Sequence, residues 1–200
     1  MSDAKLRVCR PPELPGVLYL IFDNPPMNQF TTDLWREFIN RLLEARMDDS
    51  VGVVVLTGAG ERAFSAGLSM DMLDTLKGDE DAALIYSLGY ELREALFALN
   101  KPVIAAVRGN CVGGGLEVAL CCDMIVAAEG SKFMLPEMNI GLVPGCGGAI
   151  HLMRRIAPNR AFEMLLFSQK ITAEEALSMG LINRVYPTET FGDEVRKLCE

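Results

Sequence analysis

The stretch KPVIAAVRGNCVGGGLEVALCCDMIVAAE, residues 101–129, combines the signals of a strand, a glycine-rich loop, a helix and a second strand. Its opening run, residues 102–107, is short, apolar and rich in β-branched side chains, which predicts a buried strand. The helix is expected to begin near Gly113, Gly114 and Gly115, because residues without Cβ atoms let another group approach the backbone closely. The first N–H groups of a helix have no partner within it, so this turn favours the binding of negative charge.

Glu117 follows within the first turn of this expected helix. Its carboxylate is therefore predicted to lie beside the free N–H groups, as an acid/base next to a site for an oxyanion. The same pattern also fits an ordinary strand-to-helix turn. In that case the glycines permit close packing and Glu117 only favours the helix N-terminus.

Length and composition indicate a well-buried globular chain. With 200 residues, half of them hydrophobic, the sequence suits one domain, or one domain with an appendage. A net charge of −8 and a pI near 4.8 disfavour nucleic acid or an anionic membrane as the main partner. No stretch approaches the ~20 apolar residues of a membrane span, and the first ten residues lack the apolar core of a secretion signal.

The cysteines show no CxxC pair and no zinc-like spacing, and the single histidine, His151, cannot complete a metal-binding cluster. We therefore expect no metal, no disulfide framework and no chemistry at the cysteines. A reducing cytoplasm is the expected compartment. The mitochondrial matrix stays open if a transit segment has been removed. The six cysteines are Cys9, Cys111, Cys121, Cys122, Cys146 and Cys199.

Strand and helix signals alternate along the chain, which predicts the α/β class. Strands are expected at residues 16–22, 51–57, 102–107, 124–128, 132–135 and 181–185, and helices at residues 31–47, 79–99, 149–156, 158–167 and 192–200. Thr172 and Glu175 form a predicted capping box, and Gly180 suits the residue after that helix. Residues 58–60, Gly-Ala-Gly, lack the third glycine of a dinucleotide-binding loop, so a Rossmann fold is not favoured.

Three glycine-bearing turns carry a resemblance to a known family. They are the segment Phe64-Ser65-Ala66-Gly67-Leu68, the triple glycine with Glu117, and the segment that runs from Pro136-Glu137 to Pro144-Gly145. In this order and spacing they resemble the enoyl-CoA hydratase/isomerase (crotonase) superfamily. The resemblance covers nearly the whole chain and is densest over KPVIAAVRGNCVGGGLEVALCCD and PEMNIGLVPGCGG. It implies a spiral of repeated ββα units that assembles as trimers or dimers of trimers.

The resemblance also implies an acyl-CoA thioester as the ligand, with coenzyme A as part of the substrate and no further cofactor. The thioester carbonyl would accept hydrogen bonds from the backbone N–H groups of Leu68 and Gly114, an oxyanion hole. Such donors are each worth about 10²–10³ in rate when charge develops on the oxygen. The substrate-binding positions implied by the resemblance are Met27, Ala66, Leu68, Ser69, Met70, Asp71 and Gly114.

Glu117 and Glu137 match the two acid/base positions of the hydratases, one for the water at C3 and one for the proton at C2. Gly145 matches the backbone position that helps to hold this water. The resemblance thus implies an enoyl-CoA hydratase. The alternatives that stay open are a Δ3,Δ2-enoyl-CoA isomerase, another crotonase-type acyl-CoA enzyme, and a non-catalytic acyl-CoA-binding or oligomerisation subunit. Glu137, which follows a proline, could also simply cap a turn.

Some residues depart from the family pattern. Ser69 and Met70 stand where many members carry an acidic and then a basic residue, and the early turn Asn24-Pro25-Pro26 lacks a basic contact to the CoA phosphates. Arg62 or Lys77 could compensate, although both fit surface charges.

The C-terminal part of the family is largely absent from this sequence. The chain is expected to divide into a crotonase-like core, residues 1–187, and the start of a truncated helical region, residues 188–200. Either the chain is truncated, or another subunit covers the acyl pocket. Apolar surface left by the short end would favour a homo-oligomer, built on a trimer.

Overall fold

A computed structural model describes residues 4–74 and 78–200 of the chain. Its larger sheet has six strands, all parallel to their neighbours except the antiparallel pair at one edge. In spatial order they are β1 (Lys5–Cys9), β2 (Val17–Asp23), β3 (Val53–Gly58), β5 (Val103–Val107), β7 (Met124–Ala128) and β10 (Arg184–Tyr186). The predicted α/β class is confirmed.

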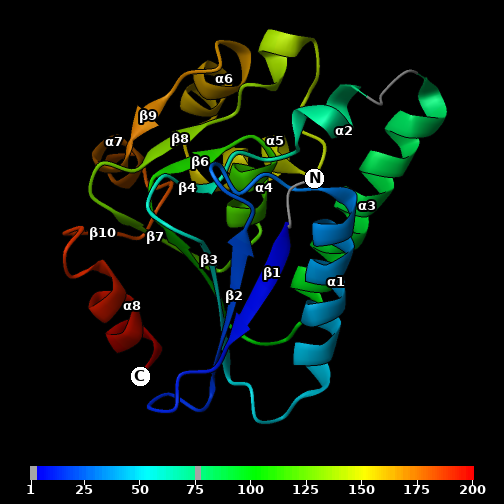
Figure 1. Cartoon of the computed structure of the whole chain (residues 1–200). Coiled ribbons are helices and arrows are strands. Elements are labelled where there is room, and N and C mark those ends of the chain that lie inside the picture. The colour runs from blue at the N-terminus through cyan, green and yellow to red at the C-terminus, as the bar shows by residue number, and fades with distance from the viewer. Residues whose placement is uncertain (1–3, 75–77) are drawn as a thin grey trace.

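A second sheet of four short strands lies beside the first (Figure 1). Its strands are β4 (Ala63–Ser65), β6 (Asn110–Val112), β8 (Lys132–Met134) and β9 (Ile171–Thr172). Three successive strand pairs, β3–β4, β5–β6 and β7–β8, each place one strand in each sheet. Glycines with positive φ stand at the corners of these pairs: Gly60, Gly109 and Gly130. At Gly109 a Cβ would lie 2.4 Å from the carbonyl oxygen of Arg62, so that corner admits no side chain.

Helices follow these strand pairs and complete the repeated ββα units. They are α2 (Met70–Asp74), α3 (Asp79–Phe97), α4 (Gly114–Leu120), the 3₁₀ helix η1 (Glu137–Ile140), α5 (Gly148–Arg155), α6 (Pro158–Leu166) and α7 (Ala173–Ser178). The chain also has α1 (Thr32–Met47) after β2 and α8 (Phe191–Cys199) at its end. The predicted spiral of ββα units matches this arrangement.

The two faces of the large sheet are covered by different helices. Alternate residues of its strands enter a core with α1 and α3, in which Trp35 is 1% exposed and Phe22 makes edge contacts with Phe30, Phe38 and Phe64. The intervening residues pack against Phe191 and Val195 of α8. Figure 1 shows α1 and α3 on one side of the sheet and α8 on the other. Period-two alternation therefore decides which helix each strand residue meets.

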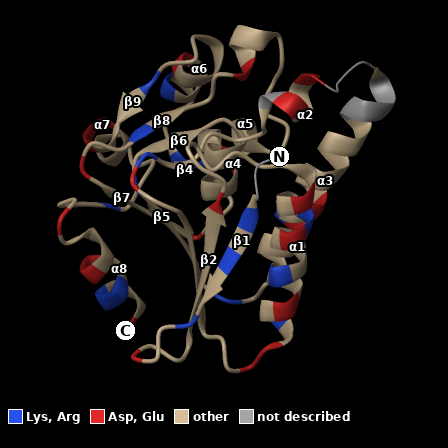
Figure 2. Ribbon diagram, in the orientation of Figure 1, with Lys and Arg blue, Asp and Glu red and all other residues tan. Residues whose placement is uncertain are grey.

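Local signals placed several elements correctly. Thr31 caps α1 by accepting the N–H of Leu34, and the capping box of Thr172 and Glu175 is present. Gly180 has φ +79°, as expected for the residue that ends α7. Acidic and basic residues alternate along α1 (Figure 2), where the predicted Glu37–Arg41 ion pair measures 3.6 Å.

Other elements lie at shifted positions or were not predicted. The strand predicted at residues 181–185 is found at Arg184–Tyr186, because Leu181 and Ile182 are buried in the turn that follows α7. β1 was missed because its sequence, KLRVC, alternates apolar and polar residues over only four positions; in the structure Leu6 is its one buried residue. The expected end helix is α8, which begins at Phe191, one residue early. The division of the chain at residue 187 stays a prediction.

Candidate active site

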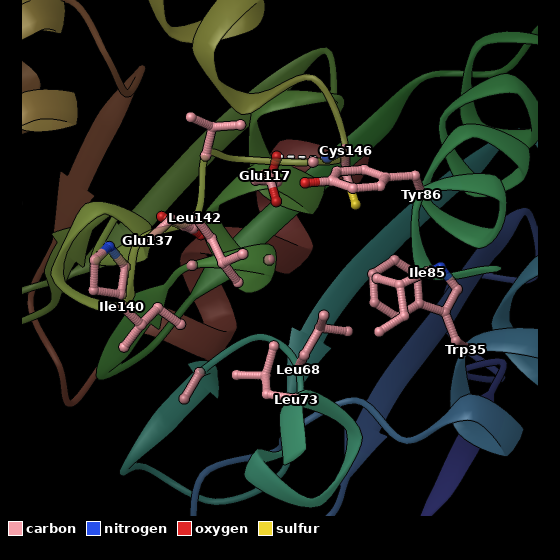
Figure 3. A pocket seen from close by; sticks show the side chains of 16 residues that line it. Trp35, Leu68, Leu73, Ile85, Tyr86, Glu117, Glu137, Ile140, Leu142 and Cys146 are labelled. Atoms are coloured by element: carbon pink, nitrogen blue, oxygen red, sulfur yellow. Dashed lines mark hydrogen bonds between the residues drawn. The ribbon is translucent and has the colours of Figure 1, made fainter. Parts of the chain in front are cut away.

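A largely apolar pocket opens where α3, the turn after β4, the start of α4 and the loop around η1 meet. It encloses about 790 Å³, part of it open to solvent, and Figure 3 shows its wall. Among the described residues that line it, three have side chains with oxygen: Tyr86, Glu117 and Glu137. The apolar lining comes from Trp35, Ala66, Leu68, Leu73, Ile85, Pro136, Ile140, Leu142 and Val143, with Gly113, Gly114, Gly145 and Cys146 completing the wall.

The turn after β4 lies directly against the start of α4. A Cβ built on Gly67, whose φ is +77°, would be 2.6 Å from the nitrogen of Gly114. A Cβ on Gly114 would be 3.8 Å from the nitrogen of Leu68. Only a glycine at position 67 combines this φ with this approach. The structure thus brings the backbones of Leu68 and Gly114 together, as the sequence predicted.

Hydrogen bonds fix the turn on both sides of Leu68. Phe30 donates its N–H to the carbonyl of Gly67 at 2.7 Å, and Ser69 donates to the carbonyl of Phe30 at 3.0 Å. Ser65 Oγ accepts the N–H of Gly67 at 3.1 Å. Within the described part of the chain, the N–H groups of Leu68 and Gly114 have no protein acceptor. Two rigidly held donors are therefore available to a ligand in the pocket.

Glu117 extends from the first turn of α4 and is 4% exposed. Its Oε1 accepts the N–H groups of Cys146 at 2.7 Å and of Gly148 at 2.9 Å. The predicted location beside the donors of its own helix needs correction, because the bound N–H groups belong to the loop that leads into α5. A Cβ at Gly148 would lie 2.7 Å from Cγ of Glu117, so this close contact with the Glu117 side chain requires glycine at position 148.

The electrostatics of Glu117 combine two opposing effects. Burial raises the pKa of its carboxyl, while the N–H groups of Gly148, Cys146 and Gly145 lower it by stabilising the charged form. Gly145 thus lies in the pocket wall beside Glu117, and its role in holding the water stays a prediction.

Glu137 is the first residue of η1, directly after Pro136. Its Oε2 is buried, and no partner for it lies among the described residues. A Cβ on Gly113 would be 3.2 Å from its Oε1, so the carboxyl packs against the glycine turn. The pKa of Glu137 is raised to about 7, mainly by burial; its own N–H lowers the pKa, and the charge of Glu117 contributes to the rise. Two carboxyls with different surroundings therefore share one pocket.

The other substrate-binding positions differ in their relation to the pocket. Ala66 lies in the pocket wall and donates its N–H to the carbonyl of Met27 at 2.9 Å. Ser69 Oγ accepts the N–H of Met72 at 3.3 Å at the start of α2, where Asp71 is exposed. Met70 begins α2.

The structure describes one of the two possible basic contacts to CoA. Arg62 is exposed, as expected for a surface charge, and Lys77 falls outside the described residues.

The comparisons with known proteins agree with this geometry. The sequence profile described as enoyl-CoA hydratase/isomerase matches residues 13–200. The chain belongs to the enoyl-CoA hydratase/isomerase family. It is 38% identical over 185 residues to a carnitinyl-CoA dehydratase of Proteus mirabilis, across 92% of this chain and 70% of that protein. It is 36% identical over 184 residues to a crotonyl-CoA hydratase of Syntrophomonas wolfei, across 91% of this chain and 70% of that protein.

A solved structure extends the agreement to the fold. The crystal structure of an enoyl-CoA hydratase from Bacillus anthracis matches with a TM-score of 0.92 at 31% identity, over 98% of this chain and 75% of that one. The protein is therefore an enzyme of the enoyl-CoA hydratase/isomerase family with the crotonase fold. The resemblance seen in the three glycine turns is confirmed.

Two pocket residues of this family member escaped the sequence analysis in their true role. Ile85 and Tyr86 fall within the helix predicted at residues 79–99 and were given no part in the site, yet both line the pocket, and Tyr86 is 44% exposed. Cys146 and Gly148 were also missed as donors to Glu117. A tyrosine within an otherwise apolar helical stripe was the one available signal, because a phenol needs a polar environment for its hydroxyl.

The cysteines and the histidine take structural positions. Burial raises the pKa of the Cys111 and Cys146 thiols, which opposes formation of a reactive thiolate. The His151 ring packs edge-on against Phe97, with ring centroids 5.3 Å apart, and lines a different pocket from the one that Glu117 lines. In the described ranges no cluster of side chains could hold a metal ion, and no helix there is both long and apolar enough to cross a bilayer.

Proposed function

We propose that this enzyme adds water across the double bond of a 2-enoyl-CoA thioester to give the 3-hydroxyacyl-CoA. The observation that carries the proposal is the pairing, in one apolar pocket, of two free backbone N–H groups with two unlike carboxyls. The names of the relatives, crotonyl-CoA hydratase and carnitinyl-CoA dehydratase, support the same class of reaction. No cofactor beyond the CoA of the substrate is needed.

In this proposal the thioester carbonyl accepts the N–H groups of Leu68 and Gly114. Attack at C3 moves negative charge onto the carbonyl oxygen as an enolate forms, so the donors bind the transition state more tightly than the substrate. Because the Gly67 turn is anchored by hydrogen bonds and the α4 start by its helix, the donors are already in place. Each is worth about 10²–10³ in rate.

The two carboxyls divide the proton transfers. Glu117 acts as the base, since the N–H groups of Cys146 and Gly148 hold its carboxylate in place and burial, the larger effect, raises its pKa and makes the anion a stronger proton acceptor. It takes a proton from the water whose oxygen bonds to C3. Glu137 acts as the acid and gives its proton to C2, since burial without a partner favours its neutral form near pH 7. Gly145 lies beside Glu117 and holds the water, and proton exchange between the carboxyls and solvent restores the starting state.

The apolar wall suits the acyl chain. The CoA portion of the bound substrate must extend out of the pocket through its open side. We assign contacts with the CoA portion to Met27, Ser69, Met70 and Asp71, which stand around the turn before α2. The bacterial relatives and the six free cysteines fit a reducing compartment, so a cytoplasmic location is part of the proposal.

A Δ3,Δ2-enoyl-CoA isomerase is the second candidate. It needs one carboxyl that both accepts and donates a proton, and Glu137 with its pKa of about 7 suits that task. The hydrogen bonds that fix Glu117 favour hydration instead, because isomerisation requires only one carboxylate and would leave Glu117 without a role.

The test is turnover of short 2-enoyl-CoA thioesters, followed by the loss of absorbance of the conjugated thioester. The wild-type enzyme is expected to hydrate them, and Glu117→Gln and Glu137→Gln are expected to lose about 10²–10⁴ in kcat. Glu189→Gln, an exposed matched change, should leave the rate unchanged. If the wild type binds these thioesters without turnover, the enzyme is a binder and hydration is excluded. Isomerisation of 3-enoyl-CoA that survives Glu117→Gln would favour the second candidate.

Assembly into a homo-oligomer, built on a trimer, is also part of the proposal. Large apolar side chains are exposed on neighbouring segments beside the pocket, and exposed apolar surface of this kind marks interfaces. They include Ile140, Val143, Ile150, Phe162, Leu166 and Phe167. Sedimentation at micromolar concentration should give a trimer or a multiple of it. A fully active monomer would contradict this assembly.

A further inference from the structure

Tyr86 is the third polar side chain of the pocket, and the mechanism above gives it no role. It extends from α3, and a Cβ on Gly145 would lie 2.7 Å from its Cε1 and 3.0 Å from its Cδ1. One edge of the ring therefore lies close against the backbone of Gly145. Figure 3 shows its hydroxyl directed toward Glu117.

The hydroxyl of Tyr86 is free to bind a ligand. Among the described hydrogen bonds none involves it, and the nearby wall is formed by apolar groups such as Ile85 and Leu142. A phenol is both a donor and an acceptor and carries no charge at neutral pH. It can therefore orient a water molecule without disturbing the charges of the two carboxyls.

We propose that Tyr86 positions the attacking water and thereby makes the site a hydratase; this inference rests on the proposed function. The water gives one hydrogen to the carboxylate of Glu117 and directs the other to the phenol oxygen of Tyr86. A lone pair of the water then faces C3, where the new C–O bond forms. Glu117 takes the first proton and the electron pair of the double bond moves through C2 to the thioester oxygen. The phenol keeps its own proton throughout, so Tyr86 positions the water and does not transfer protons.

Gly145 is the structural partner of this role. A side chain at position 145 would collide with the ring edge of Tyr86, which is the movable group because it belongs to a half-exposed helix residue. The glycine therefore lets the phenol approach the water beside Glu117. Gly145→Ala keeps the backbone N–H and displaces the ring, so it should reproduce the loss of the hydroxyl.

The experiment compares Tyr86→Phe with the wild type in two reactions. Hydration of crotonyl-CoA needs the water, whereas exchange of the C2 hydrogen of butyryl-CoA with D₂O needs the enolate but no attack at C3. We expect kcat for hydration to fall about tenfold, the worth of one neutral hydrogen bond, with KM changed less than about twofold. Hydrogen exchange at C2 should stay within about twofold of wild type.

Tyr90→Phe is the matched control. Tyr90 lies one turn further along α3, is 55% exposed and carries Arg93 over its ring, outside the pocket wall. Both reactions should be unchanged in this variant. Equal losses in hydration and exchange for Tyr86→Phe would show a general structural effect and overturn the inference.

A double-mutant cycle gives a second, independent readout. If Gly145→Ala acts by moving the Tyr86 ring, the variant that combines it with Tyr86→Phe should hydrate no more than about threefold slower than the slower single variant. If the fold-losses in hydration of the two single variants multiply in the double variant, Gly145→Ala does not act through the Tyr86 ring. Unchanged hydration in Tyr86→Phe overturns the inference but leaves the proposed function intact. A wild type without hydratase activity overturns both.

Discussion

Replacing Gly67 by alanine should disable the pair of backbone donors while leaving every proposed catalytic side chain in place. The added Cβ would stand 2.6 Å from the nitrogen of Gly114 and 3.2 Å from the carbonyl oxygen of Val112. Both contacts are with backbone, so the Gly67 turn and the start of α4 must move apart. The donors of Leu68 and Gly114 then no longer converge on one oxygen atom.

The expected loss is that of about one oxyanion donor, 10²–10³ in kcat. Stability should fall as well, by about 1–2 kcal/mol for a non-glycine residue in the left-handed region, plus the steric term. Gly60→Ala is the matched control, because Gly60 has φ +74° and no atom within 4 Å of its Cβ position. It carries the same backbone strain without the collision.

The assay is hydration of crotonyl-CoA, with thermal unfolding of the same samples. Both variants should lower Tm by a few degrees, at about 2–4 °C per kcal/mol for a chain of this size. Only Gly67→Ala should lose activity by two orders of magnitude or more. If Gly67→Ala turns over within about threefold of Gly60→Ala, the two N–H groups do not act together and the thioester assignment is wrong.

Three further outcomes follow from the same contacts. The folded pKa of Glu137, about 7, exceeds its unfolded value of 4.5. The free energy of unfolding should therefore fall as pH rises from 4.5 to about 7, by at most about 3 kcal/mol, a figure that solvent screening reduces. In urea titrations at a series of pH values, Glu137→Gln should make the free energy of unfolding depend less on pH. Thr172→Ala should cost about 1 kcal/mol because it removes the cap of α7, whereas Thr190→Ala, at a helix start without a side-chain cap, should cost less than half of that. Glu117→Gln should fold normally by circular dichroism, because the amide oxygen can still accept the N–H groups of Cys146 and Gly148.

Much of the fold could be predicted because its signals are local. The strand at Met124–Ala128 was placed correctly at both ends, since a short buried run between turn residues has few other structures available. α1 was predicted to within one residue of its observed start because its apolar side chains recur at helical spacing, whereas the cap at Thr31 was not predicted. β4 and β6, with three residues each, were too short to show any periodicity.

The site was predictable where a motif carries its own geometry, and less so where partners come from distant segments. Leu68 and Gly114 were placed together by the resemblance, and the structure agrees. The donors to Glu117 are 29 and 31 residues away in the chain, and no local pattern indicates them. Tyr86 shares the helical spacing of core residues, and periodicity does not distinguish a face that meets the core from one that meets a pocket.

Hydration of crotonyl-CoA in ¹⁸O-labelled water and, separately, in D₂O, with mass analysis of the product, tests the central claim most directly. If Glu117 activates water for C3 and Glu137 delivers the proton to C2, each product molecule gains one oxygen-18 in the first solvent. In the second it gains one deuterium bound to C2. The amount of labelled product formed in a fixed time should fall by about 10²–10⁴ with Glu137→Gln and stay unchanged with Glu189→Gln. Deuterium entering the acyl chain without oxygen-18 ever reaching C3 would contradict the account, because the site would then only move protons.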